Sequence, residues 1–359
     1  MARIRFQQTL IVLLSLAAFF RVGDAGCPIA SLGRRSLKQA PVPAQPALIF
    51  GFYDLTCPTL NSIIDTRMRF WVLQDIRTPG KVLRLFFHDC FAAGCEASIL
   101  LNSTAEFAAE KDAPISVTLD KFQVIEDIKS EVETACPGIV SCADILALAA
   151  AKAVELAGGP ILVTETGRRD GVVSYLAGAT ASMPLSTQKI PDLEAMFVQA
   201  GLDINDLVIL SGAHTIGEVH CSNFADRFDP AANSPFGDVS FGQELLAFCT
   251  RNGAGDIATL NLKTFMDLQT PNSFDISYYV NLIIGRGVMT SDQVLFNDLR
   301  TQPMVREFAA NRTLFFESFQ ASMLKMGRLH VLTGTNGVIR KQCGVSVQLE
   351  ISILRSLRT

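Results

Sequence analysis

The segment from Arg84 to Phe91 constrains the fold most, because it places four charged or reactive side chains in a stretch that is otherwise apolar. If this segment is helical, Arg84 and His88 stand four residues apart on one face, whereas Asp89 points about 100° away. A buried cation beside a titratable base is costly unless a partner or a ligand uses it. A lone histidine could simply be satisfied within a core, but this combination predicts a functional site.

The N-terminus has the pattern of a secretory signal peptide. Arg3 and Arg5 precede an apolar run over residues 10–20, and small residues precede a cleavage site near Ala25. The run is too short to cross a bilayer comfortably, and no later stretch is long and apolar enough, so we expect no membrane span. The net charge of -4 gives no support for a nucleic-acid partner.

We expect one large folded domain over residues 48–345, flanked by segments that do not belong to it. Residues 1–25 are the predicted signal peptide, and residues 26–47 carry four prolines, which is typical of a linker or propeptide. The C-terminal extension over 346–359 alternates apolar and polar residues. It could be a short edge strand, a loose extension or a sorting signal.

The nine cysteines favour an oxidising compartment. Cys27 lies just after the predicted cleavage site, which leaves an even set of eight. Zinc binding is the competing interpretation, but paired C-x-x-C clusters are missing. Eight cysteines allow about 105 pairings, so the residues alone determine none. The eight are Cys57, Cys90, Cys95, Cys136, Cys142, Cys221, Cys249 and Cys343.

Apolar residues recur with helical spacing along most of the chain, which predicts a mainly α-helical fold with minor strands. Thr78-Pro79-Gly80 should interrupt the helices, and Ser141 to Asp144 has the spacing of a capping box with Asp in place of Glu. A short strand is expected over 161–166 and a loop over 229–242. Helices are expected over residues 59–75, 84–91, 122–132, 145–157, 193–200, 205–216, 275–284 and 303–326.

Two of the four histidines, His88 and His214, fall in buried helical contexts in different halves of the chain. Such a pair suits a haem held between them, and without a C-x-x-C-H motif the haem would be bound non-covalently. A globin would also need a proximal histidine. Arg84 favours peroxide chemistry, because cleavage of an O–O bond needs a base and a charge that stabilises the departing oxygen.

Five motifs, in order, extend this interpretation over residues 48–343. The chain resembles the secretory plant haem peroxidases, class III of the plant peroxidase superfamily. The motifs are Phe52-Tyr53-x-x-x-Cys57-Pro58, Arg84-Leu85-x-Phe87-His88-Asp89-Cys90-Phe91-x-x-Gly94-Cys95, Val140-Ser141-Cys142-Ala143-Asp144-Ile145, Gly167-Arg168-Arg169-Asp170-Gly171 and Leu210-Ser211-Gly212-Ala213-His214-Thr215-Ile216-Gly217.

The resemblance implies a monomeric hydrogen-peroxide oxidoreductase with one haem b. It would reduce peroxide to water and oxidise small phenolic donors in one-electron steps through ferryl intermediates. His88 is the expected distal base and Arg84 the charge stabiliser. His214 is the expected ligand of the haem iron, and Asp292 the acceptor of its other ring N–H. Two further positions are expected in the pocket: Phe87 beside the haem, and Pro184 on the path of aromatic donors.

The resemblance also implies two calcium ions, for which clusters of oxygen ligands are suitable. The distal set is Asp89, Ala92, Gly94, Glu96 and Ser98, and the proximal set is Thr215, Asp267, Thr270, Ser273 and Asp275. By composition alone, 267–275 could be a capped helix start. The implied disulfides are Cys57–Cys136, Cys90–Cys95, Cys142–Cys343 and Cys221–Cys249. Asn102 and Asn311 begin glycosylation sequons.

One departure from the family concerns the support of the distal base. Family members carry an Asn after a Glu-Lys-Asp segment, which accepts a hydrogen bond from the distal His. Here Glu110-Lys111-Asp112 is followed by no Asn before Phe122, and Ser116 is the nearest polar candidate. We therefore expect oxidation by peroxide to be slower than is usual for the family, by about tenfold or more.

Smaller departures are Glu96 in place of Asp, Met266 in place of an aromatic residue, and Leu162 where Trp is common. Two other functions share some of these features. A phospholipase A2 would need a glycine-rich calcium loop and denser cysteines. A haem- and calcium-binding protein with weak or no turnover, acting in the wall or in storage, is the main alternative. The chain would be secreted to the cell exterior or wall, or sent to the vacuole by its tail.

Overall fold

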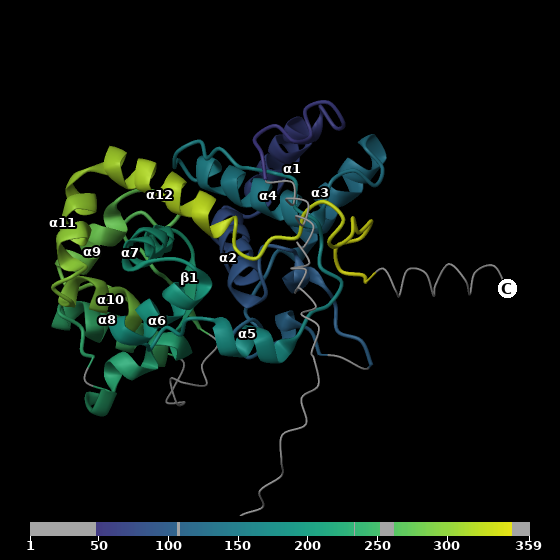
Figure 1. Ribbon diagram of the computed structural model, residues 1–359. Coiled ribbons are helices and arrows are strands. Elements are labelled where there is room, and N and C mark those ends of the chain that lie inside the picture. The colour runs from purple at the N-terminus through teal and green to yellow at the C-terminus, as the bar shows by residue number, and fades with distance from the viewer. Residues whose placement is uncertain (1–47, 106–107, 233, 252–261, 347–359) are drawn as a thin grey trace, which may run out of the picture. The chain divides into compact units, whose positions relative to one another are not determined.

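Helices form most of the regular structure (Figure 1). The computed structural model describes residues 48–105, 108–232, 234–251 and 262–346. The predicted signal peptide, the predicted linker and the C-terminal extension beyond Ser346 lie outside the described residues. Within the described ranges, no helix is both long and apolar enough to cross a membrane. The prediction of a mainly α-helical fold with minor strands is confirmed.

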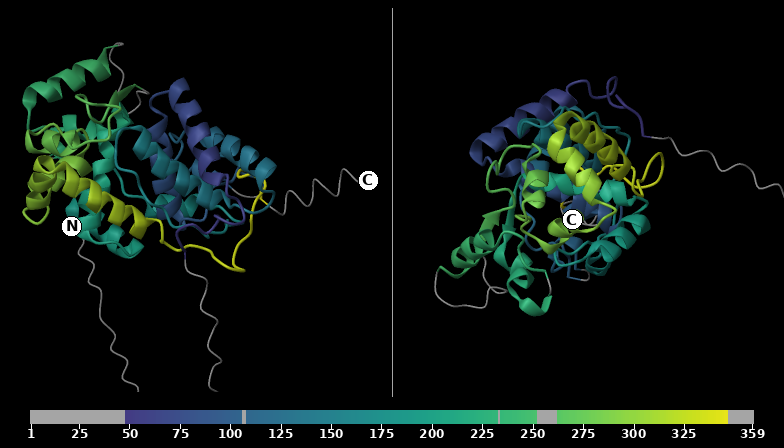
Figure 2. Two further views of the ribbon diagram at one scale, coloured as in Figure 1. Left: turned by 90° about the horizontal axis from the view of Figure 1, so that it is seen from above. Right: turned by 90° about the vertical axis from the view of Figure 1, so that its left-hand side faces the viewer.

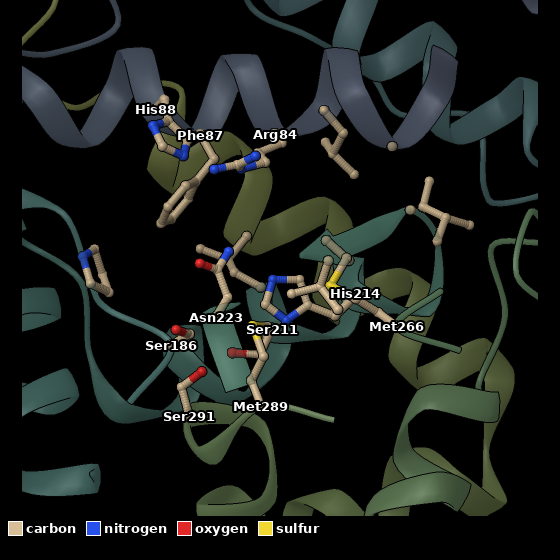
Figure 3. Close-up of a pocket in the computed structure, with 18 of the residues that line it drawn as sticks. Arg84, Phe87, His88, Ser186, Ser211, His214, Asn223, Met266, Met289 and Ser291 are labelled. Atoms are coloured by element: carbon tan, nitrogen blue, oxygen red, sulfur yellow. The ribbon is translucent and has the colours of Figure 1, made fainter. Parts of the chain in front are cut away.

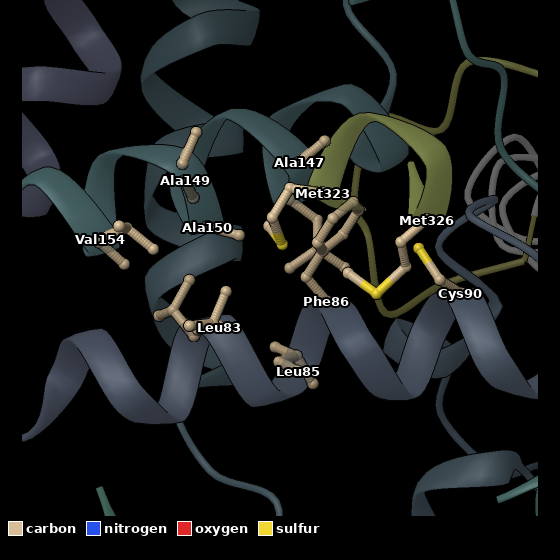
Figure 4. Packing of buried hydrophobic residues seen from close by; sticks show 14 of the residues in the cluster. Leu83, Leu85, Phe86, Cys90, Ala147, Ala149, Ala150, Val154, Met323 and Met326 are labelled. Atoms are coloured by element: carbon tan, nitrogen blue, oxygen red, sulfur yellow. The ribbon is translucent and has the colours of Figure 1, made fainter. Parts of the chain in front are cut away.

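The helix α2 (Thr78–Ala92) carries the Arg84–Phe91 segment and packs along α4 (Cys142–Leu156). Leu83 and Phe86 of α2 meet the small side chains of Ala147 and Ala150, which allow the two helices to approach closely (Figure 4). Two further helices, α1 (Leu60–Gln74) and α3 (Phe122–Ala135), pack on each other and on α4. The helices α1, α3 and α4 thus form one packed group with α2.

The later helices form a second group, joined to the first by α12 (Arg312–Met326). At the C-terminal end of α12, Ser322 and Lys325 donate to Asp206 of α7. At the same end, Met323 and Met326 join the core beside Phe86 (Figures 2 and 4). The other helices of this group are α6 (Ile190–Ala200), α7 (Ile204–Ser211), α9 (Ser277–Ile283), α10 (Thr290–Asn297) and α11 (Gln302–Ala310).

Short elements fill the connections between these groups. β1 (Glu218–His220) pairs antiparallel with β2 (Lys263–Phe265), so that Val219 lies opposite Thr264. In the ranges that the structure describes, the remaining α-helices are α5 (Leu176–Ser182) and α8 (Val239–Thr250). The 3-10 turns are η1 (Ser98–Leu100), η2 (Glu110–Asp112), η3 (Gly212–Thr215), η4 (Cys221–Phe228) and η5 (Pro230–Ala232).

Four disulfides lie among the described residues. Most join segments that are far apart in the sequence, and one joins near neighbours. They are Cys57–Cys136, Cys90–Cys95, Cys142–Cys343 and Cys221–Cys249, the four pairs that the family resemblance implies. The third of these bonds closes a loop of 201 residues between the start of α4 and the end of the domain. Cross-links over long loops reduce the conformational freedom of the unfolded chain most.

The expected strand over 161–166 is wrong. Only Thr166 makes a β-bridge, with Ile49. Elsewhere in this segment the amide of Gln320 takes the place of a partner strand, because it accepts from Val163 N at 2.6 Å and donates to Val163 O at 3.0 Å. The apolar side chains that suggested a strand do not mark a buried face, since Ile161 and Val163 are 77% and 55% exposed.

Several helix boundaries also differ from the predictions. The helix expected over 303–326 is two helices, because Asn311 leaves the helical conformation and its Oδ1 accepts from Leu314 N at 3.0 Å to begin α12. The loop expected over 229–242 contains the start of α8, which Asp238 caps. Pro79 lies in the first turn of α2 rather than in a break, where its missing N–H is tolerated.

The capping box predicted at the start of α4 is only half formed. Ser141 accepts from Asp144 N at 3.1 Å, as expected for an N-cap. The Asp144 carboxylate does not return to the backbone of Ser141. It accepts instead from Tyr53, from Gly167 N and from the Arg168 guanidinium, all within 2.8 Å. Asp144 therefore ties α4 to two distant segments.

Candidate active site

A cavity lies between α2 and the segment that runs from the end of α7 to β1 (Figure 3). Arg84, Phe87 and His88 line it from α2, whereas Ser211 and His214 line it from the opposite wall. The two histidines that the sequence analysis singled out therefore face a single cavity, although they come from different halves of the chain.

His88 reaches this cavity because helical spacing places it on the same face of α2 as Arg84. Its Nδ1 lies 3.4 Å from Ser116 Oγ, which is long for a hydrogen bond. Burial, and then the charge of Arg84, holds the pKa of His88 well below its ordinary value. The imidazole is therefore neutral at neutral pH and can accept a proton.

The Arg84 guanidinium is held from outside its helix. Its Nη1 donates to Thr118 Oγ1 at 3.0 Å and to Thr118 O at 3.5 Å, and its Nη2 donates to Ile115 O at 3.3 Å. Burial lowers the pKa of Arg84 to about 10, which leaves the group charged at neutral pH. A fixed positive charge thus lies beside a neutral base.

His214 lies in the 3-10 turn η3, because α7 ends at Ser211 and does not extend over 205–216 as predicted. Its Nδ1 is 2.7 Å from Asp292 Oδ1, a carboxylate that is 2% exposed. The same Oδ1 accepts from Tyr278 Oη at 3.0 Å, and Oδ2 accepts from Met289 N at 3.3 Å. These bonds fix both the carboxylate and the orientation of the imidazole.

The donor set of the cavity fits a haem that is bound without covalent attachment. With Nδ1 of His214 engaged by Asp292, Nε2 is the nitrogen left for a metal, and 35% of this side chain is exposed. Phe87 contributes an apolar wall. Arg77 and Lys81 also line the cavity, and both form ion pairs with Asp75.

Acidic side chains gather behind the opposite face of α2. The buried Asp89 carboxylate accepts from Ala97 N at 2.9 Å, and Ser98 donates to Glu110 Oε2 at 3.2 Å. Burial raises the pKa of Asp89 well above its ordinary value, and the carboxylates of Glu110 and Glu96 add to this effect. Burial also raises the pKa of Glu110 to about 7. A cation here would relieve the repulsion among these groups.

The Glu96 side chain packs against Gly171, where a Cβ atom would lie 2.5 Å from Glu96 Oε2. In the described part of the chain, no three His, Cys, Asp or Glu side chains form a group that could hold a metal ion. A cation on this side of α2 would therefore also need the predicted oxygens of Ala92, Gly94 and Ser98.

Hydrogen bonds bring together most of the second predicted oxygen cluster. Thr215 Oγ1 lies 3.5 Å from Asp267 Oδ2 and 3.3 Å from Asp275 Oδ1. Thr270 Oγ1 donates to Asp267 Oδ2 at 3.0 Å, and Ser273 N donates to Thr270 O at 2.9 Å. Through Thr215, the residue directly after His214 in η3, the cluster joins η3 to the loop before α9.

The remaining predicted residues take the following places. Pro184 lines the cavity. Asn102 and Asn311 are exposed, and Asn311 also caps α12. The two histidines for which no role was predicted are His220, which lies in β1 and lines the cavity, and His330, which is exposed after α12.

Four residues of the site were missed by the sequence analysis: Thr118, Asn223, Tyr278 and Glu110. Tyr278 and Glu110 are buried polar groups whose partners lie 14 and 12 residues away. Glu110 stands in the Glu-Lys-Asp segment of the family motif, which was a usable signal. The other three have no local pattern that marks them.

Comparison with known proteins agrees with this geometry. A model of the peroxidase family matches residues 64–311. Peroxidase 54 of Arabidopsis thaliana is 42% identical over 306 residues, which cover 82% of this chain and 83% of that protein. Peroxidase 4 of Vitis vinifera is 42% identical, covering 82% of this chain and 90% of its own length. The lignin-forming anionic peroxidase of Nicotiana tabacum is 40% identical, covering 81% and 90%. The chain therefore belongs to the peroxidase family, as a plant haem peroxidase.

Proposed function

We propose that His88 and Arg84 act together on hydrogen peroxide in the cavity, opposite His214. The observation that carries this proposal is that a neutral imidazole and a fixed guanidinium line one wall, and a carboxylate-bonded imidazole lines the other (Figure 3). A bound haem would supply the redox chemistry.

In this proposal His88 takes a proton from one peroxide oxygen and returns it to the departing oxygen, so that water leaves. Its depressed pKa supports the first step, because the group must be unprotonated. Arg84 stabilises the negative charge that develops on the departing oxygen. Asp292 holds His214 in one orientation and increases the electron density of its ring.

The donors are small phenols that reach the cavity past Pro184. Calcium ions bind at the two oxygen clusters, around Asp89 and around Asp267, and keep α2 and η3 in place. The alternative of a haem-binding protein without turnover is not favoured, because such a protein would have no use for the paired Arg84 and His88. We also propose that the protein is a secreted monomer, with residues 344–359 able to direct it to the vacuole.

Haem reconstitution followed by a guaiacol-type assay tests this function. We expect a Soret band and turnover, and we expect His88→Leu to keep the Soret band while losing about 10²- to 10⁴-fold in the rate with peroxide. The control His330→Asn changes an exposed histidine that has φ 45°, a conformation that asparagine tolerates. A Soret band without turnover in the unmodified protein would favour the binding protein instead.

The localisation is tested separately. Fusion of residues 344–359 to a secreted reporter should redirect it if the tail is a sorting signal. Unchanged secretion of the fusion would remove the vacuolar part of the proposal and leave secretion to the exterior.

A further inference from the structure

One loop contacts two polar residues of α2 that line the cavity, Arg84 and His88. Residues 113–119 form consecutive turns, in which Ser116 N donates to Ala113 O at 2.7 Å and Leu119 N donates to Ser116 O at 2.8 Å. Ser116 faces His88 and Thr118 faces Arg84, whereas Val117 between them is 63% exposed. Arg84 and His88 are four residues apart on α2, which corresponds to about 6 Å along the helix axis. The loop spans this distance between its two contacts, Thr118 and Ser116.

The contacts to Arg84 differ in strength. The bond from Nη1 to the Thr118 hydroxyl is 3.0 Å long, whereas the bonds to the carbonyls of Thr118 and Ile115 are 3.5 Å and 3.3 Å. The hydroxyl is thus the best acceptor of the three. Thr118 is β-branched, so its χ1 angle and the direction of its hydroxyl are restricted.

We propose that Thr118 is a positioning residue, whose hydroxyl fixes the Arg84 guanidinium toward the ligand side of the cavity. This inference rests on the proposed function of Arg84. An arginine side chain has many rotamers, and holding it before the ligand arrives removes the need to order it afterwards. Without the hydroxyl, the two longer carbonyl contacts allow the guanidinium to move.

Thr118→Val tests the proposal, because valine keeps the shape and the branching but cannot accept a hydrogen bond. The measurement is the affinity of the haem-loaded ferric protein for fluoride, an anion that accepts hydrogen bonds, followed by its spectrum. We expect about tenfold weaker binding in Thr118→Val, the scale of one bond to a charged group. Thr118→Ser should stay within about twofold. The matched control is Thr134→Val, at an exposed threonine on α3.

The double variant with Arg84→Leu separates positioning from a general structural effect. If Thr118 acts through Arg84, Thr118→Val will change fluoride affinity in the parent protein and will have no effect in Arg84→Leu. Equal losses in both backgrounds would overturn the inference, as would unchanged or tighter binding in Thr118→Val while Arg84→Leu weakens it. If Arg84→Leu itself leaves fluoride binding unchanged, the proposed function of Arg84 fails, and the inference fails with it.

Discussion

Replacing Ser116 with asparagine should accelerate the reaction with hydrogen peroxide. For His88 to accept a proton at Nε2, its Nδ1 must carry hydrogen and donate to Ser116 Oγ. The distance of 3.4 Å is longer than the usual N–H···O separation of about 2.9–3.0 Å. Ser116 is 1% exposed, so bulk water does not replace it. An asparagine side-chain oxygen lies one bond further from the backbone and can close this gap.

The size of the effect follows from the worth of one hydrogen bond. A typical neutral bond contributes about 0.5–1.5 kcal/mol, and about 1.4 kcal/mol corresponds to tenfold in rate. The contact of 3.4 Å between His88 and Ser116 supplies only part of this free energy. We therefore expect Ser116→Asn to raise the rate constant about threefold to tenfold, and Ser116→Ala to lower it by less than about threefold.

Stopped-flow measurement of the haem absorbance after mixing with peroxide gives the rate constants. Thermal denaturation should show that each variant is folded, and Ser130→Asn on the exposed face of α3 is the matched control. A Ser116→Asn protein that folds and reacts no faster would refute this reasoning. A loss of tenfold or more in Ser116→Ala would also refute it, because the hydroxyl would then be a full acceptor.

Three further predictions concern His88, Asp292 and Glu110. Burial and the charge of Arg84 hold the pKa of His88 below 6.5. Because the imidazole then stays unprotonated, the rate with peroxide should stay constant as the pH falls from about 8 to below 6.5. Arg84→Leu should raise the pH at which the rate begins to fall, but not to 6.5, because burial lowers the pKa of His88 more than the charge of Arg84 does. A pH–rate profile checks both expectations. Asp292→Asn should weaken haem affinity about 10- to 100-fold in a Soret titration, because the carboxylate that orients His214 is lost. Glu110 has its pKa raised from 4.5 to about 7, so its ionisation opposes folding. The calcium-free protein should lose stability as the pH rises through that interval, and calcium should restore it at about pH 8 in denaturation curves.

Local patterns predicted the parts of the fold that depend on local interactions. The helical period identified α1 to α4, and the i, i+4 spacing of Arg84 and His88 placed both on the cavity face of α2. The expected strand over 161–166 failed because its partner is the side chain of Gln320, 157 residues away. No pattern within the segment itself could have shown that.

The same limit applies to the residues that support the site. Thr118 contacts Arg84 across 34 residues, and Tyr278 contacts Asp292 only because α9 and α10 pack together. Ser116 was put forward from the absence of an asparagine, and the structure places it against His88. The distance of that contact, which determines its strength, depends on the turns over 113–119 and could not be read from the sequence.

Helix α2 connects three tasks through one rigid element. His88 and Arg84 face the cavity, Asp89 turns to the backbone of Ala97, and Cys90 is bonded to Cys95. Because these residues share one helix, a shift that relieves the buried carboxylate of Asp89 would also turn the face that carries the base and the cation. Loss of a cation beside Asp89 should therefore act on the peroxide reaction through the orientation of α2, although Asp89 does not line the cavity.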